Sequence, residues 1–393
     1  MNKISIICLK PAIGGTTAML GRVIESLKIS KMNIEVAYYE PFSIDKNNLS
    51  VRIWDIFKRC PSHISRSVND RHVEYCVGVY FPALEAGHYL LNRFWYNFVK
   101  QSDVVIVVSG SVIPALPAVL FGKKPLIWVA TPYMADRVDR VSKYGFFRKS
   151  FDRLIDAPIN RIVERYIVKR SNILSLSNYT ARKLNEICKV NIKNILPMPV
   201  DKRFFNNSAR YIDKNSIVIG YSGRFTDPRK NFDLALETIK ILVKRYPNII
   251  FKLLGDVPDK QIASKISTLN LVKNIDIVGH VEHGTMHTRI LEFDILLLTS
   301  YQEGLAIACL EAMASSIPVV STRCGGVEDY IIDGINGYLC DFNATDISSK
   351  VIELIENNNQ YRNISKSAHD TIMNDYSTNK FDKVFSYNLR EVL

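Results

Sequence analysis

Hydrophobic positions along the chain fall into short β-branched or apolar runs separated by longer amphipathic stretches. Such runs predict buried strands, because a strand covered on both faces shows no polar alternation. In the first half they cover 4–9, 34–39, 103–109, 125–130 and 172–177. In the second half they cover 217–223, 249–255, 275–280, 294–300 and 317–322. Stretches of helical length and periodicity lie between the runs, for example at 16–30, 231–246 and 305–316.

Strands that alternate with helices predict a parallel α/β sheet, and two such series predict two doubly wound, Rossmann-like domains. The length of 393 residues favours the same division, since it exceeds one typical core. A polar stretch at 204–216 separates the two series, so we place the domains at 1–205 and 206–377. Ligands of such sheets bind beyond the carboxyl ends of the strands, where we therefore expect the chemistry.

Composition changes this picture little. Hydrophobic residues make up 47% and charged residues 23% of the chain, and no run approaches the ~20 apolar residues of a membrane span. The first apolar run is too short for a signal peptide, so we expect a cytoplasmic protein, soluble or peripheral on a membrane. The seven cysteines are scattered and form no C-x-x-C pair, which fits reduced core thiols rather than disulfides or a zinc site.

Charge is distributed unevenly. The net charge is +12, but residues 1–205 hold 31 Lys and Arg against 16 Asp and Glu, and the remainder is slightly acidic. The N-terminal half therefore favours an anionic partner: phosphate groups, a membrane surface or nucleic acid.

The segment 221–231, YSGRFTDPRKN, follows a predicted strand and precedes a predicted helix. Gly223 allows a tight turn at the strand end. Arg224 and Lys230 then place two cations at a helix N-terminus, where a diphosphate would be stabilised. The alternative is a solvated basic loop.

The segment 300–331 contains Glu303 and Glu311 within otherwise apolar sequence. Eight helical residues advance ~12 Å, so the two carboxylates are too far apart for a close acid/base dyad. They can instead reach opposite ends of one extended ligand. Its phosphates would then meet the free amides of the first helical turn, which we expect to begin near Leu305 and Ala306. The alternative makes Glu303 an N-terminal helix charge and Glu311 an acid at the edge of the core.

These motifs carry a family resemblance. GRFTDPRKN, EGLAIACLEAMASSIPVV and GGVEDYIIDGINGYL closely resemble the retaining glycosyltransferase family four, whose members have the GT-B fold and use sugar nucleotides. The E-x7-E spacing of Glu303 and Glu311 is that family's signature. The resemblance covers nearly the whole chain, is strong in the second half, and is weak between about 40 and 100.

The resemblance implies a role for each matching residue in a C-terminal donor-binding domain. Arg224 and Lys230 would hold the donor diphosphate, and Glu303 would lie near the transferred sugar, so these three are the catalytic candidates. Glu311 would accept hydrogen bonds from the ribose. The other donor-binding candidates are Gly223, Gly304, Leu305 and Ala306, with Gly255 and Val281 near the nucleobase.

The N-terminal domain would bind the acceptor. Gly14 and Gly15 resemble the family's glycine loop, whose backbone amides approach the diphosphate or the acceptor. Thr131 stands where many members carry a histidine, and it cannot act as a general base. The last segment, about 378–393, resembles the final helix that packs back on the N-terminal domain.

Two further features bear on the donor. No D-x-D motif occurs in the chain, so we expect no metal ion and no other cofactor, with Arg224 and Lys230 balancing the charge of the leaving diphosphate. The family usually reads EGFG where this chain reads EGLA, so Ala306 replaces a glycine and narrows the pocket.

Two other segments allow more than one interpretation. His280, His283 and His287 lie close together in sequence, but their spacing fits a polar rim better than a zinc site. Residues 137–170 hold ten Lys and Arg among several aromatic residues, which fits a helix at an anionic membrane surface or a solvated helix that packs its apolar face on the domain. No nucleic-acid-binding motif accompanies the charge.

The resulting expectation is a metal-independent, retaining hexosyltransferase with a nucleotide sugar as donor. The acceptor would be a glycan or a lipid-linked saccharide, and the setting bacterial surface polysaccharide biosynthesis. The alternatives are a catalytically silent GT-B protein that binds a nucleotide, and a GT-B enzyme of other sugar-nucleotide chemistry such as an epimerase.

Overall fold

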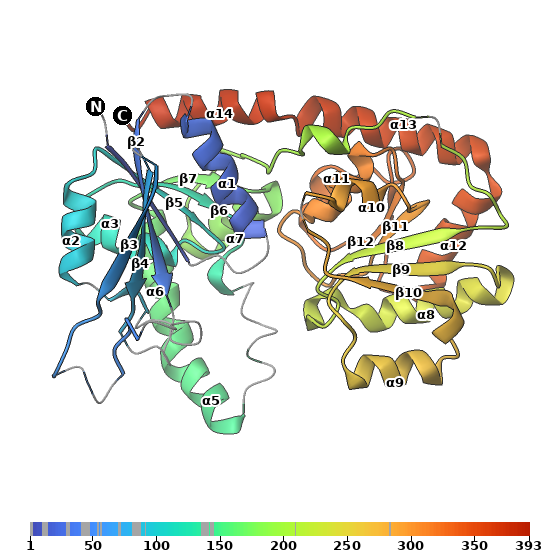
Figure 1. The fold of residues 1–393 in the computed structure, drawn as a ribbon, viewed down its shortest axis with the longest axis horizontal. Helices are drawn as coiled ribbons and strands as arrows, with labels where there is room; N and C mark the ends of the chain where they lie inside the picture. Colours follow the sequence, from blue (N-terminus) through green and yellow to red (C-terminus); the bar gives the residue numbers. More distant parts are fainter. Residues whose placement is uncertain are drawn as a thin grey trace. The chain divides into compact units, whose positions relative to one another are not determined.

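The structure is a computed structural model that describes residues 3–9, 15–28, 32–40, 48–52, 55, 57–69, 72–80, 88–90, 92–134, 141, 145–208, 210–282 and 284–393. The chain forms two compact units. Unit 1 comprises Met1–Leu196 and Asp382–Leu393, and unit 2 comprises Pro197–Phe381. Figure 1 shows the elements of each unit, which we describe separately.

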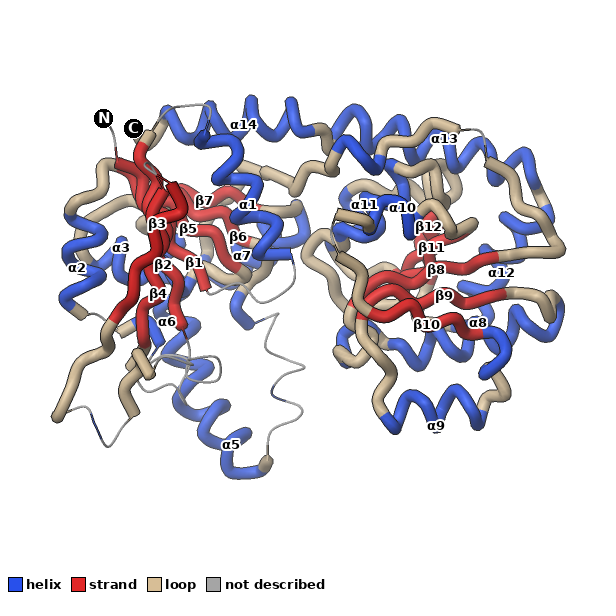
Figure 2. The backbone as a smooth tube through the Cα atoms, viewed as in Figure 1, coloured by secondary structure: helices blue, strands red, loops and turns tan. Residues whose placement is uncertain are grey.

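Unit 1 is built on a seven-stranded sheet of order β3-β4-β2-β1-β5-β6-β7 (Figure 2). Its strands are β1 (Lys3–Leu9), β2 (Asn33–Glu40), β3 (His63–Asn69), β4 (His72–Gly78), β5 (Val104–Ser109), β6 (Leu126–Val129) and β7 (Asn172–Ser175). All neighbours pair in parallel except β3 and β4, which form an antiparallel pair at one edge.

Helices cover both faces of this sheet. They are α1 (Gly15–Lys28), α2 (Arg93–Lys100), η3 (Ile113–Ala115), α3 (Leu116–Leu120), α5 (Phe146–Phe151), η4 (Asp152–Asp156), α6 (Ala157–Val168) and α7 (Asn178–Cys188). One core cluster joins α2 and α6 to strand residues such as Ile7 and Val107. Ile6 and Ile106 are fully buried outside that cluster, which fits a sheet covered on both faces.

Unit 2 has a six-stranded parallel sheet of order β10-β9-β8-β11-β12-β13. Its strands are β8 (Val218–Gly223), β9 (Ile250–Gly255), β10 (Ile275–Gly279), β11 (Ile295–Leu298), β12 (Val319–Thr322) and β13 (Tyr338–Cys340). Its helices are η5 (Lys202–Phe204), η6 (Pro228–Lys230), α8 (Phe232–Arg245), α9 (Lys260–Thr268), η7 (Val272–Asn274), α10 (Met286–Ile290), α11 (Ile307–Ala314), η8 (Gly326–Asp329), α12 (Ala344–Glu356) and α13 (Asn358–Asp375).

The strand order of unit 2 reverses between β8 and β11. The chain runs from β8 through β9 to β10 on one side, and from β11 through β12 to β13 on the other. Ile219 and Gly220 of β8 lie beside Ile295 and Leu296 of β11, so the loops that follow these two strands leave the sheet next to each other. Ligands of open parallel sheets bind at such a reversal.

The division of the chain lies earlier than the boundary after residue 205 predicted from the polar stretch. Residues 197–205 belong to unit 2 because the Phe204 carbonyl accepts a hydrogen bond from Ser315 Oγ and the Val200 amide donates to the Tyr376 carbonyl. Helix α14 (Thr378–Arg390) carries the chain into unit 1, where Asp382 accepts hydrogen bonds from Arg22 and, at 2.7 Å, from Ser26.

Candidate functional site

Lys230 and Glu303 meet at the reversal of the unit 2 sheet. Lys230 ends the short helix η6 after β8, and Glu303 lies in the loop between β11 and α11. Lys230 Nζ lies 2.7 Å from Glu303 Oε1, and Ser300 Oγ donates to the same oxygen at 2.6 Å. The two charged side chains are 19% and 14% exposed. The loops that the sequence predicted to carry the chemistry therefore share one hydrogen-bonded cluster.

The backbone at Lys230 is held by buried hydroxyl groups. Tyr221 Oη donates to the Lys230 carbonyl at 3.3 Å, and Thr299 Oγ1 donates to the carbonyls of Lys230 and Asn231 at 3.1 and 3.0 Å. Asn231 takes a left-handed conformation with φ of 47°, which turns the chain into α8. Lys230 is thus positioned by the ends of both β8 and β11.

Arg224 is the more exposed cation of the site, with 64% of its side chain accessible. Its guanidinium lies 3.5 Å from Asp227, which also pairs with Arg229 at 2.7 Å. Burial acts to raise the pKa of Asp227, but the hydrogen bonds and charge of Arg229, with the charge of Arg224, lower it overall. The anionic Asp227 thus orders a basic loop beside Lys230.

The glycines predicted at the strand ends have backbone conformations that other residues rarely adopt. Gly223 has φ of 148° and Gly255 has φ of 137°. A Cβ on Gly255 would lie 2.0 Å from the Gly223 carbonyl oxygen, so β8 and β9 end in close backbone contact. Val281, predicted near the nucleobase, is half-buried after β10.

Helix α11 begins at Ile307 rather than near Leu305, which corrects the predicted start. Ala306 is its N-cap, with φ of 57° and ψ of 68°, a left-handed conformation that ends the loop before the helix. The amides at the start of the helix that lack an intrahelical partner are therefore those of Ala306, Ile307 and Ala308. The alanine that replaces the family's glycine occupies a conformation that glycine adopts at lower cost.

The loop from Glu303 to Ala306 is fixed by the segment after β12. The Gly326 amide donates to the Glu303 carbonyl at 2.8 Å, and a Cβ on Gly326 would lie 2.1 Å from the Gly304 carbonyl oxygen. Tyr330 Oη donates to the carbonyls of Leu305 and Ala306 at 2.8 and 3.3 Å. These contacts hold the loop in the shape that presents Glu303 to Lys230.

Glu311 lies in the middle of α11 and is buried, with 9% of its surface exposed. Burial, with a smaller contribution from the charge of Asp201, raises the pKa of its carboxyl from 4.5 to about 8. It is therefore largely protonated at neutral pH and can both donate and accept hydrogen bonds. Glu303 and Glu311 form no acid/base dyad, since Glu303 pairs with Lys230.

The predicted residues of the first domain lie in unit 1. Gly15 is the first residue of α1, the helix that follows β1 in the chain, and Gly14 lies outside the described residues. Thr131 follows β6, where its amide and Oγ1 both donate to the Gly110 carbonyl, at 2.8 and 3.4 Å. Gly15 and Thr131 thus lie beyond the carboxyl ends of parallel strands, as ligand-binding residues of such sheets do.

The three neighbouring histidines make no cluster in the described part of the chain. His280 is exposed, His287 packs edge-on against Phe204 at 6.2 Å between ring centroids, and His283 lies outside the described residues. No group of three His, Cys, Asp or Glu with the geometry of a metal site occurs among the described residues. Across the same residues, the helices are all too short or too polar to span a bilayer.

Sequence reasoning missed three supporting residues. Ser300 and Thr299 end the run that predicted β11, yet only the folded loops show that they bind Glu303 and the Lys230 backbone. Tyr330 was part of the motif GGVEDYI, but its hydrogen bonds span 25 positions of the chain. A polar residue at the end of a buried strand was the available signal for the first two.

Comparison with solved structures defines the fold class. The chain superimposes on Anabaena Alr3699/HepE in complex with UDP with a TM-score of 0.72 and 13% identity, covering 99% of this chain and 100% of that one. It superimposes on WaaG, a glycosyltransferase involved in lipopolysaccharide biosynthesis, with a TM-score of 0.69 and 16% identity, covering 97% and 99%. The protein has the GT-B fold, as the sequence predicted.

The match to a family model lies in the second unit. Residues 203–371 match the model of the family described as glycosyl transferases group 1. The resemblance drawn from the motifs is confirmed at this level.

Curated relatives match part of the chain. It is 28% identical over 221 residues to a Staphylococcus aureus poly(ribitol-phosphate) alpha-N-acetylglucosaminyltransferase, covering 55% of this chain and 44% of that protein. It is 23% identical over 238 residues to Bacillus anthracis N-acetyl-alpha-D-glucosaminyl L-malate synthase, covering 57% and 61%. The chain thus spans about half the length of these curated relatives.

Proposed function

We propose that the protein is a glycosyltransferase that moves a hexose-type sugar from a nucleotide sugar to a glycan or a lipid-linked saccharide. The observation that carries the proposal is the cluster of Lys230, Glu303 and Ser300 beside the first turn of α11, at the strand reversal of a group 1 glycosyltransferase domain. A relative from Rhizobium meliloti that is named for lipopolysaccharide core biosynthesis supports a setting in surface polysaccharide assembly.

The donor would lie across the loops that follow β8 and β11. Arg224 and Lys230 would bind the diphosphate, together with the free amides of Ile307 and Ala308. Glu311, a buried carboxyl, would bind the ribose hydroxyls. Glu303 would then bind a sugar hydroxyl, which requires that Lys230 be shared between this carboxylate and the phosphate.

In the proposed reaction, the bond between the anomeric carbon and the diphosphate oxygen breaks, and a bond from an acceptor hydroxyl oxygen to that carbon forms. The acceptor proton passes to the leaving diphosphate on the same face, so the anomeric configuration is retained. Cations that bind the leaving group more strongly as it gains charge lower the barrier. Arg224 and Lys230 supply that charge without a metal ion, and Glu303 stabilises the positive charge that develops on the sugar.

Unit 1 would hold the acceptor. Gly14 and Gly15 would bring backbone amides near the reacting groups, and Thr131 would hydrogen-bond a sugar oxygen. Because Thr131 is no general base, proton transfer to the leaving diphosphate is the route this chain offers.

We also propose that unit 1 binds a membrane surface through α5, η4 and α6. Phe146, Phe147 and Leu154 are 79%, 88% and 74% exposed, whereas Asp156 and Glu164 of the same helical stretch are buried. The exposed apolar side chains are those of α5 and η4, whereas α6 packs Ile167 and Val168 in the core, as the alternative from sequence expects for that helix. Exposed aromatic and aliphatic side chains next to basic residues are typical of interfacial helices.

Flotation with lipid vesicles tests the membrane proposal. The full chain should float with vesicles that contain phosphatidylglycerol, and a variant with Phe146→Ser and Phe147→Ser should stay in the soluble fraction. A Tyr211→Ser variant, which changes an aromatic residue of unit 2 that is 66% exposed, is the control and should float. Equal flotation of the double variant and the wild type would contradict the proposal.

Release of nucleoside diphosphate tests the enzymatic proposal. The full chain is incubated with UDP-, GDP- and ADP-linked sugars in the presence of EDTA, and the nucleotide product is measured. We expect turnover of one donor class that is lost in Glu303→Gln. A protein that binds a nucleotide sugar but never releases the diphosphate, with a panel of glycan acceptors present, would be a silent binding protein.

A further inference from the structure

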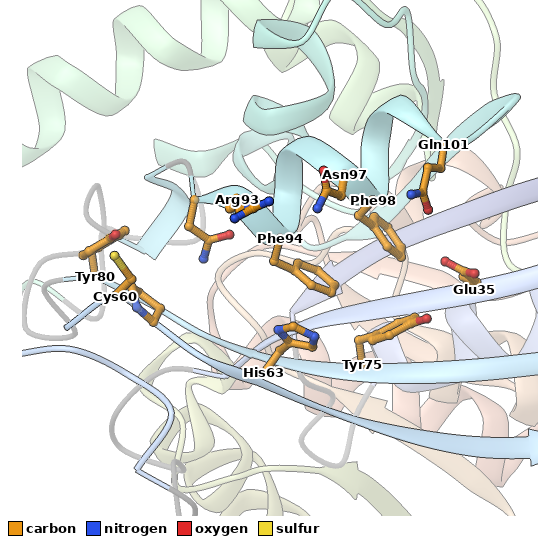
Figure 3. A pocket seen from close by; sticks show the side chains of 12 residues that line it. Glu35, Cys60, His63, Tyr75, Tyr80, Arg93, Phe94, Asn97, Phe98 and Gln101 are labelled. Carbon is orange, nitrogen blue, oxygen red and sulfur yellow. The ribbon is translucent and has the colours of Figure 1, made fainter.

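A groove in unit 1 carries the strongest further observation. It lies between α2 and the sheet, and Figure 3 shows Phe94 and Phe98 of α2 pointing toward His63 and Tyr75 of the sheet. Its volume is about 450 Å³, within the range of small-ligand sites. This part of the chain lies in the stretch between 40 and 100 to which the sequence assigned no chemistry.

We propose that this groove binds a neutral saccharide unit of the acceptor, at a position separate from the sugar that receives the transferred group. The assignment of this saccharide to the acceptor rests on the proposed glycosyltransferase function. The binding of a saccharide rests on the aromatic walls, the uncommitted polar groups and the charge balance of the groove.

Aromatic rings form the walls. Phe94 lies 4.6 Å from His63 and 5.4 Å from Tyr75 between ring centroids, and it stacks on Phe98 at 5.4 Å. Phe98 is buried, whereas Tyr75 and Phe94 are half-buried and His63 is exposed, so ring surface faces the groove. A pyranose ring has flat faces of C–H groups, which pack well on such rings.

Polar groups at the rim have hydrogen-bonding capacity to spare. Within the described residues, the Tyr75 hydroxyl, the Arg93 guanidinium and the Asn97 amide form no hydrogen bond or ion pair with other side chains or the backbone. Burial, with the charge of Glu35, raises the pKa of Tyr75, which keeps its hydroxyl a donor. Donors and acceptors that frame an apolar wall match the equatorial hydroxyls of a sugar.

The carboxylate at one end of the groove is neutralised by a lysine of the same unit. Glu35 pairs with Lys3 at 2.9 Å, and Lys3 Nζ also donates to Gln101 at 3.3 Å. Figure 3 places Glu35 and Gln101 at one end and Cys60 and Tyr80 at the other. At this end a phosphate would meet the Glu35 carboxylate, whose lysine is already paired, so we expect a neutral ligand there, with the Arg93 guanidinium as a hydrogen-bond donor elsewhere on the rim.

The aromatic wall exceeds what is needed to attach α2. Trp95, Phe98 and Val99 are buried and fix the helix on the sheet, with exposed fractions of 0%, 4% and 0%. Phe94 and Tyr75 add ring surface that solvent reaches. A residue that served packing alone would be covered, so these two side chains are the test positions.

Saturation-transfer NMR titrations of the full chain with maltose and with N,N′-diacetylchitobiose test the proposal. We expect binding of at least one disaccharide, weakened about fivefold or more in Phe94→Ala and in Tyr75→Ala. Tyr75→Phe keeps the ring and should lose about threefold through the hydroxyl alone. Tyr96→Ala is the matched control, because Tyr96 lies on the same helix, is 48% exposed and packs on Phe121 instead.

Circular dichroism and the melting temperature of each variant establish that it is folded, and Tyr75→Phe serves where an alanine variant unfolds. Equal affinity in wild type, Phe94→Ala and Tyr75→Phe would overturn the proposal, as would displacement of the disaccharide by inorganic phosphate. Binding of UDP-, GDP- or ADP-glucose by the same variants separates the two proposals. If the variants bind the donor and also bind the disaccharide as tightly as the wild type, only the groove proposal is refuted. If disaccharide binding requires Phe94 but the wild type binds no nucleotide sugar, the proposed glycosyltransferase function is refuted and the groove proposal stands.

Discussion

The buried carboxyl of Glu311 should make the stability of unit 2 depend on pH. Its pKa is about 8 in the folded protein and 4.5 as an ordinary value, so the folded state holds the proton more tightly than the unfolded state. The buried carboxyl of Glu311 therefore does not lower the free energy of unfolding below about pH 4.5. Its destabilising effect grows as pH rises and is complete above about pH 8. The change to test is Glu311→Gln, which keeps the shape and removes the titration.

The size of this change in the free energy of unfolding follows from the pH range between the two pKa values. Each pH unit inside it removes about 1.4 kcal/mol, so the wild type should lose roughly 2–3 kcal/mol relative to Glu311→Gln between pH 5 and pH 7. For a domain of 150–250 residues this corresponds to a relative shift of about 5–10 °C in melting temperature. The difference between the two proteins cancels the titration of all other groups.

Differential scanning calorimetry of both proteins at pH 5, 6 and 7 measures this difference, with the transition of unit 2 followed by its response to nucleotide. Glu237→Gln, on the exposed side of α8, is the matched control and should track the wild type at each pH. If Glu311→Gln tracks the wild type as closely as the control does, Glu311 is ionised and solvated at neutral pH, and its assignment as a buried, protonated carboxyl is wrong.

Two substitutions test the loop before α11. Ala306→Gly should stabilise unit 2 by about 0.5–1 kcal/mol. The substitution relieves ~1–2 kcal/mol of left-handed backbone strain, which exceeds the cost of the greater chain entropy of glycine in the unfolded state. Ala308→Gly, inside the helix, should instead destabilise unit 2. A melting temperature lowered by both would contradict the strain at Ala306. Gly326→Ala should weaken nucleotide-sugar binding about tenfold, because its Cβ would lie 2.1 Å from the Gly304 carbonyl oxygen and must displace the loop. Gly284→Ala, with open space around it, is the control, and equal affinities would contradict the clamp.

Most strands of the two units were predictable because they are covered on both faces, but the short β13 was not among the predicted runs. A continuous apolar run that recurs between helices, such as 104–109, predicts a buried strand of a parallel sheet. The structure has such a strand there, with all six residues buried. The antiparallel pair β3 and β4 was missed for the opposite reason. All seven residues of β3 are exposed, so it lacks the burial pattern from which a strand is predicted.

The site was predictable in its residue types but not in its contacts. Lys230 and Glu303 each follow a predicted strand, which indicated loops at the carboxyl ends of strands, and the structure joins the two residues in an ion pair because β8 and β11 are neighbours in the sheet. The left-handed backbone of Ala306 and the approach of Gly326 to Gly304 depend on packing between segments far apart in sequence. The sequence therefore placed the start of α11 two residues early and described Ala306 only by the size of its side chain.

Isothermal titration with the donor that the nucleotide-sugar panel selects tests the central claim most directly. The account predicts that Lys230→Ala and Arg224→Ala each weaken binding of that donor by about tenfold or more, since hydrogen bonds to charged groups contribute ~1.5–3 kcal/mol. Lys244→Ala, an exposed cation on α8, should leave the affinity unchanged. Wild-type affinity in both Lys230→Ala and Arg224→Ala would contradict the claim that the loops after β8 and β11 bind a sugar nucleotide.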